Sequence, residues 1–149
     1  MAKKEIQSES DVTLLSEALA VKGQRLTEQR LGVYQYLMSV NTHPTAEEVY
    51  FAIKDRISKV SLATVYNALE TLVSCGLTAK LTFSGGISAR YDWRTEPHSH
   101  TRCIRCGTIQ DLKRMAAPKL LEKINLDGFR VVGCNMELLG YCPSCAKIG

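Results

Sequence analysis

The chain has 149 residues, which is enough for one ordinary domain or two small ones. Hydrophobic residues make up 45% and charged residues 23%, and no apolar run approaches the roughly 20 residues that span a bilayer, so the composition excludes an integral membrane protein and favours a soluble globular one. The net charge of +4 lies wholly in residues 94–149, because residues 1–93 hold 10 basic and 10 acidic side chains. The overall charge therefore does not identify a class of partner.

The first half of the chain is predicted to be helical. Apolar residues recur at helical spacing over residues 10–22, and Gly23 ends that helix. Thr27 is predicted to cap a second helix. The residues expected to face inward from these two helices are Leu14, Leu15, Ala18, Leu19, Leu31, Tyr34, Leu37 and Met38.

Two further helices are predicted from their first residues. In Thr45-Ala46-Glu47-Glu48 a threonine is followed three residues later by a glutamate, which is the capping-box pattern and predicts a third helix to about Arg56. Ser61 is predicted to cap a fourth helix that runs to Cys75 and stops at Gly76. Its inward face is expected to consist of Leu62, Val65, Leu69 and Leu72.

The stretch LTAKLTFSGGISARYDW, residues 77–93, has two β-rich runs on either side of Ser84-Gly85-Gly86, which is typical of a β-hairpin. Short helices followed by a hairpin are the plan of a winged helix-turn-helix. Residues 1–93 are therefore assigned to such a domain. The stretch RTEPHSH, which contains a proline and no apolar residue, indicates a hinge at about 93–97.

Residues 94–149 predict a second, smaller α/β domain. His100–Asp111 is expected to form a short strand pair that turns at Cys106-Gly107, and Phe129–Tyr141 is expected to form one long strand. Pro118–Ile124 is expected to be a short helix with Leu120, Leu121 and Ile124 inward. The predicted fold class is thus α+β.

Four of the six cysteines form two CxxC pairs, at Cys103 and Cys106 and at Cys142 and Cys145. The first residues, MAKKEIQSESDV, contain no apolar core of a signal peptide, so we expect a cytoplasmic protein, in which such pairs bind metal rather than form disulfides. Four thiolates leave no open position on Zn²⁺, so one structural zinc is expected to staple the domain of about 56 residues. The alternative is a pair of redox-active CxxC motifs.

Cys75 and Cys134 lie outside these pairs. Cys75 ends an amphipathic helix, and Cys134 falls in a predicted strand. Buried free cysteines behave as small hydrophobic side chains, and we expect that of both, with a redox or ligand role as the alternative.

The histidines indicate a second metal site of a different kind. His98 and His100 face the same way on an extended segment, Asp92 lies six residues before them, and Asp111 is placed to return alongside. Imidazoles with carboxylates suit Fe²⁺, Mn²⁺ or Zn²⁺, and the carboxylates favour the first two. His43 would connect the first half of the chain to this set. The alternative is a group of hinge histidines that make surface hydrogen bonds.

The fourth helix is the candidate recognition helix for DNA. Ala63, Tyr66, Asn67 and Glu70 share its outward face, where asparagine can read adenine edges and an aromatic ring can meet thymine methyl groups. An ordinary solvated face is the alternative. The segments 22–30 and 54–59, each of net charge +2, could hold phosphates. The DNA-contacting residues predicted are Lys22, Arg25, Thr27, Gln29, Arg30, Ser61, Ala63, Thr64, Tyr66 and Asn67.

Over residues 10–147 the chain resembles the Fur family of bacterial metalloregulators. The resemblance rests on the motifs LTEQR, HPTAEEVY, VSLATVYNALETL, GLTAKL, RYDWRTEPHSHTRCIRCG and GYCPSCAK. It implies a homodimer with an N-terminal winged helix and a C-terminal α/β dimerisation domain. Asp92, where iron-sensing members usually have glutamate, and Asn67, where they usually have arginine, make the chain most similar to the peroxide-sensing PerR branch. Pro97 and Ser99 replace ligands of the third metal site of many members, so no third metal is expected.

The resemblance implies a function. His43, Asp92, His98, His100 and Asp111 would bind one regulatory Fe²⁺ or Mn²⁺ per subunit, and the metal-loaded homodimer would bind operator DNA as a repressor rather than act as an enzyme. With iron, peroxide would add oxygen to His43 or His98, and DNA would be released.

Three other functions remain open at this point. A plain iron-, manganese- or zinc-responsive repressor would bind DNA in a metal-dependent way that survives peroxide. A metalloenzyme would use the His/Asp site to activate water, and needs an open coordination position and a general base. A thiol switch would sense peroxide at the zinc cysteines and leave the histidines unchanged.

Overall fold

The computed structural model describes residues 9–83, 85–96, 98–112, 123–124, 126–131 and 136–148. The chain divides into two compact units, Met1–Thr95 and Glu96–Gly149, so that the boundary falls inside the segment predicted as a hinge. None of the helices in the described ranges combines the length and the apolar composition that a bilayer crossing requires. The helices and small sheets confirm the predicted α+β class.

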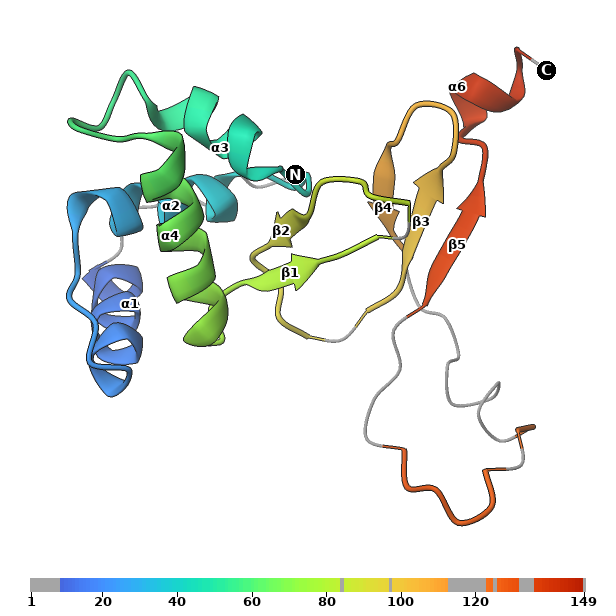
Figure 1. Ribbon diagram of the computed structural model, residues 1–149, viewed down its shortest axis with the longest axis horizontal. Coiled ribbons are helices and arrows are strands. Elements are labelled where there is room, and N and C mark those ends of the chain that lie inside the picture. Colours follow the sequence, from blue (N-terminus) through green and yellow to red (C-terminus); the bar gives the residue numbers. More distant parts are fainter. Residues whose placement is uncertain are drawn as a thin grey trace. The chain divides into compact units, whose positions relative to one another are not determined.

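The first unit holds four helices, α1 (Glu9–Val21), α2 (Glu28–Ser39), α3 (Ala46–Ile53) and α4 (Leu62–Ser74) (Figure 1). The three predicted caps are confirmed: the hydroxyls of Thr27, Thr45 and Ser61 each accept a hydrogen bond from the backbone N–H three residues later. At Thr45 the capping box is complete, because the Glu48 carboxylate accepts from the Thr45 N–H at 2.8 Å. Each cap satisfies an N–H group that the helix itself leaves unbonded.

The third helix ends at Ile53, three residues before the predicted end at Arg56. The residues that follow form turns, which include Lys59 at φ +55°. Ile57 packs against α2 at Gly32, where an added Cβ would lie 1.9 Å from the Ile57 side chain. Ile57 fills this space, and this packing accompanies the early end of α3. No local pattern in the sequence predicts it.

The core of the first unit lies between α1, α2, α3 and α4. The predicted side chains Leu15, Leu19, Tyr34, Leu37, Val65, Leu69 and Leu72 are buried in it, together with Val33, Ala46, Val49, Ile53 and Ala68. Leu31, Met38 and Leu62 are partly buried, and Cys75 packs against the same core as predicted. Leu14 was expected to face inward and is 52% exposed, because Leu15 and Leu19 occupy the helical stripe that faces the core.

The predicted hairpin is confirmed as β1 (Ala79–Leu81) paired antiparallel with β2 (Arg90–Asp92), with Lys80 opposite Tyr91. Tyr91 is 1% exposed and belongs to the core. Its N–H donates to the Pro44 carbonyl at 2.9 Å and its hydroxyl donates to Glu70 of α4 at 3.1 Å. The hairpin is therefore tied both to the residues before α3 and to α4.

The second unit is built on a three-stranded sheet in the order β4-β3-β5, from β3 (His100–Cys103), β4 (Ile109–Asp111) and β5 (Glu137–Gly140), followed by the short helix α6 (Pro143–Ala146) (Figure 1). The first two strands pair antiparallel, as predicted, and β3 and β5 pair parallel. The sequence analysis did not anticipate α6, which begins at Pro143, a residue whose fixed φ suits a first helical turn.

Two predictions for the second unit are wrong in part. Among the described residues of the expected strand Phe129–Tyr141, only Glu137–Gly140 form a strand. Asp127 and Gly128, both at positive φ, form a turn that leaves Phe129 73% exposed. Lys123 and Ile124 are not helical, and Ile124 is 47% exposed rather than inward. Leu120, Leu121 and Cys134 lie outside the described residues.

Candidate functional site

The four paired cysteines converge on one point of the second unit. Cys103 ends β3, and a tight turn brings Cys106 back, with Gly107 at φ +73° donating its N–H to the Cys103 carbonyl at 2.9 Å. Cys142 stands at the N-cap of α6, and Cys145 lies on that helix. The two turns are joined by a hydrogen bond from the Ile104 N–H to the Gly140 carbonyl at 2.9 Å.

The sulfur geometry fits a tetrahedral zinc ion. The Cys106 and Cys142 sulfurs are 3.7 Å apart, and all four sulfurs lie within 4.8 Å of one another. Zinc–sulfur bonds of about 2.3 Å at tetrahedral corners place neighbouring sulfurs about 3.8 Å apart. No disulfide joins any of the described cysteines.

The electrostatics of the four thiols also suit a bound cation. Hydrogen bonds from the backbone at Cys106 and Cys142 lower the pKa of Cys103 to about 6, and the Thr108 hydroxyl lowers the pKa of Cys106. The hydrogen bond with the Cys142 sulfur, burial and the other nearby sulfurs raise the pKa of Cys145 to about 12. Thiols this close resist becoming four thiolates together unless a metal ion neutralises them, and Zn²⁺ does so.

A histidine and a carboxylate meet inside the first unit. His43 precedes Pro44 and the capping box of α3, and Asp92 is the last residue of β2. The His43 Nε2 and Asp92 Oδ2 atoms are 3.2 Å apart, and the two side chains are 3% and 2% exposed. The other carboxylate oxygen of Asp92 accepts the Arg94 N–H at 2.9 Å, which fixes the orientation of the carboxylate.

Two histidines and a carboxylate meet inside the second unit. The predicted return of Asp111 is confirmed, because it pairs with His100 across β3 and β4. One oxygen of Asp111 lies 3.1 Å from His98 Nε2 and 3.3 Å from His100 Nε2. The two imidazole rings lie 4.4 Å apart between centroids, so the predicted common direction of the HxH pair is also confirmed.

The tautomer of His98 favours a metal ion at this group. Its Nδ1 atom lies 2.6 Å from the Glu96 carbonyl oxygen, which can only accept a hydrogen bond, so Nδ1 carries the proton. This leaves Nε2 as the ring atom that faces the Asp111 carboxylate, at 3.1 Å. A histidine that donates its second nitrogen to a carbonyl is the common arrangement in metal sites.

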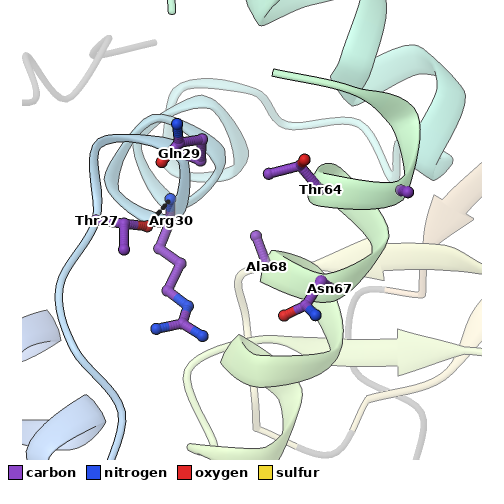
Figure 2. Close-up of a pocket in the computed structure, with 7 residues that line it drawn as sticks. Thr27, Gln29, Arg30, Thr64, Asn67 and Ala68 are labelled. Atoms are coloured by element: carbon purple, nitrogen blue, oxygen red, sulfur yellow. Dashed lines mark hydrogen bonds between the residues drawn. The ribbon is translucent and has the colours of Figure 1, made fainter. Parts of the chain in front are cut away.

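A third feature is a shallow hollow of about 410 Å³ between α2 and α4. Figure 2 shows Arg30 extending from the start of α2 toward it, with Thr64, Asn67 and Ala68 on the facing side of α4. The guanidinium of Arg30 donates to the Arg25 carbonyl at 2.6 Å and to the Gln24 side chain at 2.7 Å, so its position is fixed. The residues that line the hollow are Thr27, Gln29, Arg30, Ala63, Thr64, Asn67 and Ala68.

Six of the ten residues predicted to contact DNA line this hollow, and the other four lie outside it. Lys22, Arg25 and Ser61 are exposed, and the Ser61 hydroxyl is engaged in the cap of α4. Tyr66 is 40% exposed, and its hydroxyl donates to Glu47 of α3 at 2.9 Å. Ala68 also lines the hollow and was not among the predicted residues, although its i+4 spacing from Thr64 places it on the same side of the helix.

Four helices with a hairpin, followed by a sheet that carries a zinc-type cysteine cluster, define a metal-binding winged-helix protein. Residues 21–139 match the model of the Ferric uptake regulator family. The Peroxide operon regulator of Bacillus subtilis (strain 168) is 35% identical over 132 residues, which are 88% of this chain and 90% of that protein. The chain therefore belongs to the ferric uptake regulator family, which confirms the resemblance seen in its motifs.

Solved structures agree with the fold. The Helicobacter pylori ferric uptake regulator Fur superimposes with a TM-score of 0.80 at 22% identity, over 98% of this chain and 97% of that one. The Campylobacter jejuni peroxide stress regulator superimposes with a TM-score of 0.63 at 30% identity, over 93% of this chain and 100% of that one.

Proposed function

We propose that the protein is a metal-dependent DNA-binding repressor that senses hydrogen peroxide. The observation that carries the proposal is the division of one histidine–carboxylate set between the two units: a buried His43–Asp92 pair in the first, and His98, His100 and Asp111 in the second. Only residues 93–97 separate Asp92 from His98 in the sequence. The relatives named for peroxide regulation support the sensing part of the proposal.

In this proposal the two groups bind one regulatory Fe²⁺ or Mn²⁺ per subunit together. Neither group alone supplies the five or six ligands that these ions usually take, whereas the joint set offers three imidazoles and two carboxylates. Binding through both groups would select one arrangement of the winged helix relative to the second unit. In a homodimer, that arrangement would present two α4 helices to successive major grooves of operator DNA in the cytoplasm.

The zinc has a separate role in this proposal. Four sulfurs complete its coordination, so it holds the dimerisation unit together and has no open position for a substrate. The regulatory set likewise lacks a further histidine to act as a general base, since the chain has 3 histidines and all are assigned as ligands. Both points favour a regulator over a metalloenzyme.

Peroxide would act on the protein itself. Fe²⁺, when bound by these residues, would supply the electron transfer that activates hydrogen peroxide, whereas Mn²⁺ would not. A ring carbon of His43 or His98 would gain one oxygen atom in place of its hydrogen, and the second oxygen of the peroxide would leave as water. The oxidised ring would be a poorer nitrogen ligand, so the joint ligand set would bind the metal less tightly and the protein would leave the DNA.

Peroxide treatment should therefore oxidise histidines in the iron-loaded protein alone. After exposure of the Fe²⁺-loaded and Mn²⁺-loaded proteins, peptide mass spectrometry should find the added mass of one oxygen on the His43 or His98 peptide of the iron form only. Operator binding, measured in parallel, should be lost in the same sample. Unmodified histidines with DNA binding intact would instead indicate a plain metal-responsive repressor, and zinc loss with unmodified histidines would indicate a thiol switch.

The hollow between α2 and α4 is proposed as part of the DNA interface. Arg30 would meet a phosphate there, while Thr64 and Asn67 face base edges. Replacing Arg30 with glutamine should weaken Mn²⁺-dependent binding to all DNA sequences alike. A plot of log K against log salt should become shallower by about 0.9 for each subunit contact removed. A loss confined to one operator sequence would contradict a phosphate contact.

A further inference from the structure

Arg90 contacts the backbone of His43, the first histidine of the proposed regulatory centre. Its guanidinium donates to the His43 carbonyl at 2.7 Å, across 47 residues of sequence. The same Nη1 atom lies 3.3 Å from a Glu48 carboxylate oxygen. That oxygen accepts the Thr45 N–H at 2.8 Å and completes the capping box of α3. Arg90 thus connects His43 with the N-terminus of α3.

Strand β2, which carries Arg90, also contacts His43 through Asp92. Residues two apart on a strand share one face, so Arg90 and Asp92 lie on the same face of β2. Asp92 meets the His43 ring at Nε2, whereas Arg90 meets its backbone carbonyl. These contacts, one at each end of the residue, restrict both where His43 lies and how its ring is turned.

The Arg90–Glu48 ion pair adds little stability by itself. The two side chains are 25% and 55% exposed, and exposed ion pairs contribute about 0–1 kcal/mol. The charge of Arg90 is also unfavourable for the proposed function, because a cation repels Mn²⁺ or Fe²⁺ bound at His43 and Asp92. The hydrogen bonds of Arg90, rather than its charge, therefore explain its position next to the ligands.

We propose that Arg90 is a positioning residue of the regulatory metal centre, which preorganises His43 for the ion by holding its backbone against β2 and the α3 cap. The inference rests on the proposed function, since it needs His43 to be a ligand. Hydrogen bonds from outer residues of this kind typically change metal affinity by about 10–100-fold.

The two possible roles of Arg90 predict opposite changes in Mn²⁺ affinity when Arg90 is replaced with glutamine. If Arg90 acts by charge alone, replacing it with glutamine should strengthen Mn²⁺ binding. If it positions His43, the same substitution should weaken Mn²⁺ binding about tenfold. Arg90→Lys keeps the charge but not the planar fork of donors, so its affinity should lie between those of the wild type and Arg90→Gln.

The test titrates Mn²⁺ into the full-length, zinc-loaded protein and records thermal unfolding of the zinc-loaded, Mn²⁺-free form of each variant. Lys80→Gln is the matched control: Lys80 lies opposite Tyr91 on the neighbouring strand β1, on the other face of the hairpin from Arg90 and Asp92, and pairs with Glu70 of α4 at 2.6 Å. It removes the same charge from the same hairpin and should leave Mn²⁺ affinity unchanged. His43→Ala is the reference for loss of a ligand.

Each outcome bears on one of the two proposals. Mn²⁺ binding by the wild type that His43→Ala weakens supports the regulatory centre, and its absence overturns both the centre and the inference. If that binding is present, an Arg90→Gln protein that binds as tightly as the wild type or more tightly overturns the positioning role alone. Equal weakening by Lys80→Gln also overturns it. Should Arg90→Gln fail to fold, wild-type affinity in Arg90→Lys would decide against the positioning role.

Discussion

Replacing Cys103 with serine is expected to unfold the Glu96–Gly149 unit, and removal of zinc by a chelator should do the same. Among the described residues of this unit, the buried side chains are His100, Arg102, Cys103 and Cys145, with no buried aliphatic side chain. Because these described residues bury so little apolar surface, the metal is expected to supply much of the stability of the unit. Structural zinc in small domains supplies about 10–16 kcal/mol, comparable to the whole stability of an ordinary domain.

Hydrogen exchange and zinc content would measure this effect. The amides of β3, β4 and β5 should lose protection in Cys103→Ser, whereas those of α4 should keep it, because Leu69 and Leu72 lie in the separate core of the first unit. Cys75→Ser is the matched control, since Cys75 only packs against that first core and should leave the zinc content unchanged. Protected sheet amides in the zinc-free protein would contradict a structural role for the metal.

The features that sequence predicted well are those with a local chemical cause. Thr27, Thr45 and Ser61 were found because a helix start leaves N–H groups that a nearby hydroxyl satisfies. The cysteine pairs were found because CxxC spacing alone brings two sulfurs together. The facing of His100 and Asp111 followed from a turn between two short strands.

The features that sequence did not predict depend on contacts between distant residues. Phe129 and Val131 are strand-forming types, yet neither lies in a strand, and β5 consists of the four residues that pair with β3. Which of two adjacent leucines of α1 faces the core was likewise decided by the packing of the other helices. The contact of Arg90 with the His43 carbonyl joins a side chain to a backbone group, and a backbone group has no signature in the sequence.

Replacing Asp92 with asparagine should abolish metal-dependent DNA binding while leaving both units folded. The substitution keeps the size of a side chain that is 2% exposed, and its oxygen can still accept the Arg94 N–H. It removes a negative charge and one of the two carboxylates of the proposed regulatory set. Loss of a charged ligand should exceed the effect of losing an outer hydrogen bond, so Mn²⁺ affinity should fall by at least about 100-fold.

Operator binding as a function of Mn²⁺ concentration would measure this loss, with zinc content and thermal unfolding recorded on the same samples. Glu17→Gln is the control, because it removes one negative charge from an exposed position on α1. If Asp92→Asn still binds the operator in response to Mn²⁺, the Asp92 carboxylate is not a required ligand of the regulatory ion. His43 would then be the one proposed ligand left in the winged helix, and the proposed link between the ion and α4 would have to pass through His43 alone.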